Sequence, residues 1–143
     1  MKHEFPTEWQ RFLNPPETQP DQSVPLSLTP NHFPFQLPGK TITINEVELF
    51  LQVSKPKDYI TPLKLSFGPT GQAQEVTLVK DAIVNDLPHG TVTFLVSQGL
   101  GAWTLTAGAQ STSLNHPVSP PATTHLAPES IQDLWILCHY KCQ

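Results

Sequence analysis

The strongest pattern in the sequence is the alternation of apolar and polar residues along residues 41–53. Ile42 and Ile44 fall on even positions, whereas the next four apolar residues fall on odd ones: Val47, Leu49, Leu51 and Val53. Because strand side chains alternate between two faces, one extra residue is needed to keep all six on the same face. The pattern therefore predicts one long strand with a β-bulge at Asn45–Glu46.

Shorter alternating segments lie on both sides of this strand, separated by turn residues such as Gly and Pro. They cover residues 24–28, 33–37, 63–67, 76–78, 91–97 and 102–107. Residues 80–86 fit either a helical turn or an irregular crossover. The last segment, residues 131–140, is apolar on both faces, which predicts a strand in the middle of a sheet, covered on both sides.

One short helix is predicted near the N-terminus, over residues 7–13. Thr7 would be its N-cap and Gln10 the capping-box partner. Trp9 and Phe12 fall on one apolar face of this helix. A helix this short cannot bury that face by itself, so we expect it to dock on the rest of the domain or on a partner.

About eight short strands and almost no helix predict an all-β fold, either an antiparallel β-sandwich or a jelly roll. Residues 1–23 would form the helix and a Pro-rich lead-in, and residues 24–143 the β-sandwich domain. Only 14% of the 143 residues are charged and 16 are Pro, which favours strands joined by rigid loops over long helices. Residues 108–130 would cross between the sheets or cover an edge.

The charge distribution narrows the classes of function. The net charge is −4, and the eight Lys and Arg residues are scattered along the chain. Without a basic stripe we expect neither nucleic-acid binding nor a polybasic membrane anchor. We expect no direct membrane insertion either, because no apolar run is long enough to span a bilayer. Residues 1–6 lack the apolar core of a Sec signal.

Chemically active motifs are scarce. The six His residues occur singly, without the H-x-H or H-x-x-x-H spacing of metal ligands. No G-x-S-x-G motif is present, and the segment Gly68–Gly71 lacks the Lys-Ser/Thr of a phosphate loop. Glu46 and Glu48 share one strand face, which is more typical of a solvated face than of a catalytic acid pair. We therefore predict no catalytic, metal-binding or cofactor-binding residues and no enzymatic activity.

The two cysteines, Cys138 and Cys142, lie in the last predicted strand and just after it. Positions four apart on one extended strand are roughly 13 Å from each other. A disulfide needs Cα atoms within about 7 Å, so the pair could form only if the chain turned sharply after Tyr140. We predict that Cys138 is a core residue and that Cys142 is a free thiol on a tail.

Aromatic residues are the better candidates for binding, because Trp and Tyr dominate many binding surfaces. Trp103 takes an inward position on its strand, which predicts a core residue. Three others are candidate contacts with a partner. They are Trp9 of the helix, Tyr59 in a Pro-flanked loop, and Trp135, which fits either the core or an interface.

Several segments carry a resemblance to a known family. They are Trp9-Gln-Arg-Phe-Leu-Asn-Pro, Leu26-Ser-Leu-Thr, Phe33-Pro-Phe and Gly39-Lys-Thr-Ile-Thr-Ile-Asn-Glu-Val-Glu-Leu-Phe. Together they resemble the C-terminal end of Tc toxin A components and related "neuraminidase-like" proteins. The last strand is also similar, with Ile131, Asp133, three apolar residues and then Tyr140. The chain departs from the family after that tyrosine, where Lys141-Cys142-Gln143 replaces a run of basic residues.

The resemblance implies a non-catalytic assembly domain within a larger secreted, toxin-like chain. In that family the A component is a very large pore-forming, receptor-binding subunit that assembles as a pentamer, and its C-terminal β-domain docks the cocoon of the B and C components. The implied partner is thus another toxin subunit or a second copy of the chain. Two other functions stay open. A lectin-like, carbohydrate-binding module would expose Trp103, Tyr59 and Trp135 on one concave face, and a hydrolase would bring His89, His116 and His125 together with acids.

Overall fold

The computed structural model describes residues 1–16, 22–33, 39–54, 61–67, 73–107 and 128–143. It contains one α-helix, α1 (Pro6–Leu13), and seven strands. The strands are β1 (Ser23–Leu28), β2 (Ile42–Val53), β3 (Thr61–Phe67), β4 (Gln74–Asp81), β5 (Leu87–Gly99), β6 (Gly101–Ala107) and β7 (Ile131–Cys142). Three single-turn 3-10 helices, η1 (Pro30–His32), η2 (Ala82–Val84) and η3 (Pro128–Ser130), complete the described elements.

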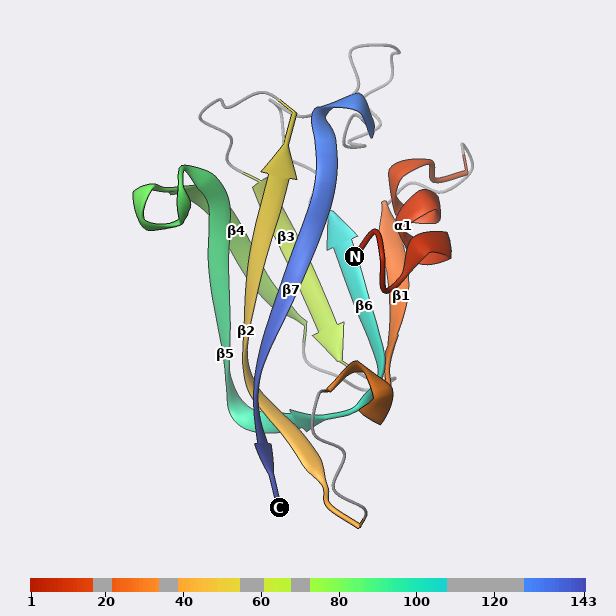
Figure 1. The fold of residues 1–143 in the computed structure, drawn as a ribbon, viewed down its shortest axis with the longest axis vertical. Coiled ribbons are helices and arrows are strands. Elements are labelled where there is room, and N and C mark those ends of the chain that lie inside the picture. The colour runs from red at the N-terminus through yellow and green to blue at the C-terminus, as the bar shows by residue number, and fades with distance from the viewer. Residues whose placement is uncertain (17–21, 34–38, 55–60, 68–72, 108–127) are drawn as a thin grey trace.

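The strands form one antiparallel ladder that folds over into two layers (Figure 1). Its order is β1-β6-β3-β4-β5-β2-β7. The fold-over lies in β4, whose first half pairs with β3 and whose last three residues, 79–81, pair with β5. The pairing is nested, because β1 pairs with β6, β2 with β5, and β3 with β4. This winding relates the sandwich to jelly rolls and confirms the all-β prediction.

Among the described residues the number of strands is seven rather than about eight. The difference is the strand expected over residues 33–37, of which 34–37 lie outside the described residues. The predicted hairpin of residues 63–67 and 76–78 is confirmed as β3 and β4. Residues 80–86 turn from β4 into β5 through η2, with Asn85 and Asp86 at positive φ.

The predicted β-bulge is confirmed in β2. The register shifts between Ile44 and Glu46 against both neighbours, β5 and β7. As a result Ile44 and Val47 both point inward, with 0% of each exposed. The bulge therefore lets the two halves of the strand share one core face although their sequence phases differ.

The prediction that residues 131–140 form a central strand is wrong. Strand β7 ends the ladder, and among the described strands it pairs only with β2. Leu134 is buried, but Trp135 is 46% exposed and Leu137 is 51% exposed. An apolar run on both faces cannot distinguish a strand covered twice from one that packs one face on the core and presents the other outward.

The helix α1 lies beside β1 at one side of the sandwich, and the residues before it reach β7 (Figure 1). It begins at Pro6, with Phe5 as N-cap and no side-chain cap, so the predicted Thr7 cap is wrong. Proline suits the first helical position because that position needs no N–H donor. Trp9 and Phe12 are 2% and 1% exposed and belong to the same core as the strands.

Candidate functional site

The outer face of the layer β5-β2-β7 carries a line of side chains that runs across four strands. Val79 of β4 is the register partner of His89 of β5. His89 is also the partner of Phe50 of β2, and Phe50 is in turn the partner of Trp135 of β7. The rings of Phe50 and His89 stack with centroids 4.4 Å apart and planes 13° apart. Val79 is 48% exposed. We call Val79, Phe50, Trp135 and the neighbouring Leu137 the apolar row.

Beside the apolar row lies a chain of alternating acids and histidines, the His–carboxylate network. His89 stands between two acids, with Nδ1 3.0 Å from Asp81 Oδ2 and Nε2 3.0 Å from Glu48 Oε2. His139 Nε2 lies 2.5 Å from Glu48 Oε1 and 3.6 Å from Glu46 Oε1. Both contacts of His89 are hydrogen bonds only when both of its ring nitrogens carry hydrogen.

The two glutamates are held from both sides. Glu46 Oε2 accepts a hydrogen bond of 3.0 Å from the Thr93 hydroxyl, while its Oε1 faces His139. Glu48 uses one oxygen for each histidine. The pKa of Glu48 is lowered chiefly by the hydrogen bond from His139; burial opposes this, and His89 adds to it. The pKa of Asp81 is lowered by the backbone N–H of Ile83 and then by His89.

Strand register puts these residues together. Glu46 is the partner of Thr93 on β5 and of His139 on β7. Because the bulge absorbs the phase change before Glu46, this residue and Glu48 both project outward while Val47 between them is buried. Ligand atoms of Glu46, Glu48 and His139 all lie within 4.8 Å of one another, so this trio is a set of side chains that could hold a metal ion.

Sequence reasoning missed this network because its members are distant along the chain. Glu48 is 41 residues from His89 and 91 residues from His139. Only Glu46 and Glu48 gave a signal, as outward alternating acids on a long strand. The pairing of β2 with β5 and β7 supplies the histidines, and the spacing of residues in the sequence does not encode that pairing.

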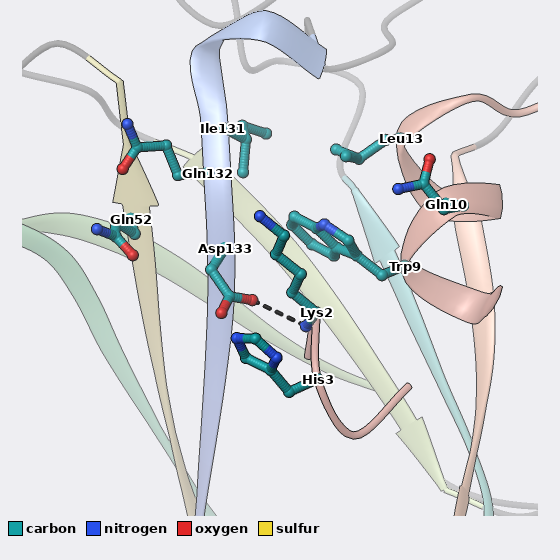
Figure 2. A pocket seen from close by; sticks show the side chains of 9 residues that line it. All are labelled: Lys2, His3, Trp9, Gln10, Leu13, Gln52, Ile131, Gln132 and Asp133. Atoms are coloured by element: carbon teal, nitrogen blue, oxygen red, sulfur yellow. Dashed lines mark hydrogen bonds between the residues drawn. The ribbon is translucent and has the colours of Figure 1, made fainter. Parts of the chain in front are cut away.

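A hollow lies between α1 and β7 (Figure 2). This open hollow of about 470 Å³ is lined by Lys2, His3, Trp9, Gln10, Leu13, Gln52, Ile131, Gln132 and Asp133. Asp133 Oδ1 accepts hydrogen bonds from the Met1 ammonium at 3.2 Å, the Lys2 amide at 3.0 Å and the Leu134 amide at 2.8 Å. The Met1 ammonium also donates to the Leu134 carbonyl at 2.6 Å.

These contacts make the hollow a joint between the first residues and β7. Asp133 Oδ2 accepts a further bond of 3.1 Å from the Trp135 indole. Burial acts to raise the pKa of Asp133, but the amides of Lys2 and Leu134 and the Met1 ammonium outweigh it, so the pKa is lowered. Asp133 is thus fully engaged in holding the structure.

The three predicted contact residues have different outcomes. Trp9 is 2% exposed because α1 docks on the sandwich, so its assignment as a surface contact is wrong. Tyr59 lies outside the described residues. Trp135 is exposed on the outer face, and Trp103 is confirmed as a core residue at 2% exposure. Trp103 therefore cannot contribute to a lectin-like concave face, whereas Trp135 is exposed.

Both cysteines are free. Cys138 is partly buried among core residues, and burial raises the pKa of its thiol to about 11. Cys142 is exposed, but it is the last residue of β7 and pairs with Ile42, so it is not on a tail. Of the histidines named for a hydrolase, His116 and His125 lie outside the described residues.

Comparisons with protein-family models, with curated proteins and with solved structures found no match. In the described parts of the chain, no helix has the length and apolar character needed to cross a membrane.

Proposed function

We propose that this chain is a non-catalytic binding domain that docks another protein on the outer face of β5-β2-β7. One observation carries the proposal: the apolar row presents Val79, Trp135 and Leu137, each about half exposed, on one continuous sheet face. Aromatic residues are enriched at the centres of protein interfaces. Exposed apolar residues that lie together on one face, unlike scattered ones, mark interaction surfaces.

The edge of β7 strengthens this proposal. Within the described part of the chain, the twelve residues of β7 have a strand neighbour on one side only. Most natural edge strands are short, twist away from the sheet or carry charged side chains, because a free edge can pair with strands of other chains. The stretch from Trp135 to Leu137 has no charged residue. A partner that covers the apolar row would also shield this edge.

The charges on the outer face favour a partner different from this chain. Three carboxylates project there, Asp81, Glu46 and Glu48, beside the apolar row, and the chain as a whole carries a net charge of −4. A symmetric dimer would place the same patch on both sides and bring like charges together. We therefore expect a partner with an apolar pocket flanked by Lys or Arg.

The resemblance to Tc toxin A components suggests a narrower form of the proposal. In that form the chain belongs to a secreted toxin-like subunit and docks the cocoon of the B and C components. The exposed last strand agrees with that role, because it is one of the segments that carry the resemblance. Mixing the chain with a purified B–C cocoon tests this narrower form separately.

The docking proposal is tested by replacing Trp135 with a photo-crosslinking phenylalanine derivative in the natural source of the protein. We expect one crosslinked protein whose attached peptide contains Lys or Arg, with a yield that falls at high salt. The matched control carries the same derivative at Ala102, an exposed position on β6 of the other layer. Equal yields at both positions, or crosslinks only between copies of the chain, contradict the proposal.

The alternative is a lectin-like module, and the exposed indole of Trp135 beside Asp133 keeps it testable. A glycan array decides between the two. Specific binding to one glycan class that is lost in Trp135→Ala would favour the lectin and contradict protein docking. We expect the array to show no binding that depends on Trp135.

A further inference from the structure

We propose that Glu46, Glu48 and His139 form a surface site for a first-row transition-metal dication such as Zn²⁺. Three ligand atoms converge there: His139 Nε2, Glu48 Oε1 and Glu46 Oε1. They come from neighbouring positions of two paired strands, so the backbone ladder holds them close together. The site is independent of the docking proposal and can succeed or fail without it.

The second oxygen of each glutamate is held by another side chain, and this orients the first oxygen toward His139. Glu48 Oε2 is held by His89, which Asp81 holds in turn, each contact being 3.0 Å. Glu46 Oε2 is held by the Thr93 hydroxyl at 3.0 Å. Each carboxylate therefore has one oxygen anchored by a protein group and one turned toward His139. Such outer partners orient ligands and raise metal affinity in known metal sites.

The donor set selects the class of ion. Two carboxylate oxygens and one imidazole nitrogen suit Zn²⁺ and its neighbours, whereas Mg²⁺ and Ca²⁺ prefer oxygen alone. Bonds of about 2.0–2.1 Å around a tetrahedral ion separate ligand atoms by about 3.3 Å. The distance from His139 Nε2 to Glu46 Oε1 is already 3.6 Å. The 2.5 Å contact to Glu48 must open, and the metal then replaces that hydrogen bond.

The ion would have access from solvent, since His139 is exposed and both glutamates are half-buried. Three protein ligands leave one position of a tetrahedral ion for water or for an outside group. His139 would bind the ion through the lone pair of Nε2. The metal would link β2 and β7 next to the apolar row, because Glu48 is the register partner of Leu137.

The proposal is tested by titrating the chain with Zn²⁺ in a calorimeter and with Co²⁺ in an absorption spectrometer. A Cys142→Ser background excludes the exposed thiol as a ligand. We expect one saturable site per chain, weakened at least ~10-fold by Glu48→Gln or His139→Gln, and also by the outer-partner change His89→Gln. The matched controls His3→Gln and Glu8→Gln, at exposed or half-exposed positions away from the site, should bind as the parent does.

Two outcomes overturn the proposal: no saturable binding, or binding that survives Glu48→Gln and His139→Gln but is lost in a His116→Gln/His125→Gln double variant. Because a variant can fail to fold, the unsubstituted chain supplies a second measurement. Substoichiometric Mn²⁺ should broaden the backbone amide NMR signals of residues 46–48 and 139 selectively. Uniform broadening, or broadening centred elsewhere, also overturns the site.

Discussion

Asp133 is a nearly buried carboxylate, 8% exposed, that two backbone amides, the Met1 ammonium and one indole surround. Its pKa lies below the ordinary value of 3.8 in the folded chain. The unfolded chain lacks these donors and takes up its proton at a higher pH. The stabilisation is therefore complete above pH 3.8 and is lost as pH falls through the lower, folded pKa.

The pH dependence of this stabilisation gives a prediction for Asp133→Asn. We expect the free energy of unfolding at pH 7 to fall by about 1–3 kcal/mol, because the amide replaces a charged acceptor with a weaker one. Below pH 3.8 the difference from the parent should shrink. Urea unfolding across this pH range measures both effects, with Glu129→Gln as an exposed control. A constant difference at every pH would show that the charge of Asp133 does not stabilise the fold.

The two cysteines differ in reactivity for a reason visible in their surroundings. Burial raises the pKa of Cys138 from 9.0 to about 11, which lowers its thiolate population about 100-fold. At pH 8 we expect one fast thiol toward a disulfide reagent such as DTNB, assigned to exposed Cys142. Cys142→Ser should remove the fast phase and Cys138→Ser should keep it. The reverse pattern would mean that the inward placement of Cys138 is wrong.

At the scale of elements, the bulge of β2 determines which residues face the core and which face the network. Deleting Asn45 removes the extra residue, and the six apolar residues of β2 then alternate regularly, so all of them can keep the core face. Deleting Glu48 instead places Val47 and the apolar residues after it on opposite faces. We expect the Glu48 deletion to cost more than about 4 kcal/mol or to prevent folding, whereas the Asn45 deletion should cost clearly less.

Urea unfolding and circular dichroism compare the two variants. Each variant shortens β2 by one residue, so each is the matched control of the other. If the Asn45 deletion destabilises the chain as much as the Glu48 deletion, the bulge is not an extra residue that aligns the two halves of β2.

Strand β2 shows which features of the structure could be predicted from the sequence and which could not. The phase slip between Ile44 and Val47 is a local signal, so the bulge could be predicted to the residue. The position of β7 was not predictable in this way, because whether Trp135 and Leu137 are covered depends on the ladder order and not on their spacing. The histidine partners of Glu48 could not be predicted either. They lie 41 and 91 residues away along the chain, and only strand pairing brings them to Glu48.

At the scale of the whole molecule, the two ends of the ladder differ in how they are covered. The helix α1 and the first residues fill the side between β1 and β7, and this burial removes Trp9 from the surface (Figure 1). The outer face of β5-β2-β7 carries the apolar row and the His–carboxylate network side by side. A single protein could therefore bind the apolar row and meet charged groups at its rim, an arrangement common in interfaces.

The central claim is that this outer face binds the protein identified by crosslinking at Trp135. The most direct test is the dissociation constant of that purified complex, measured for the parent, Trp135→Ala and the opposite-layer control Ala102→Ser. We predict that Trp135→Ala weakens binding by ~30-fold or more, corresponding to about 2 kcal/mol, while the melting temperature stays unchanged. Ala102→Ser should bind as the parent does. Unchanged affinity in Trp135→Ala, or an equal loss in Ala102→Ser, would contradict the account.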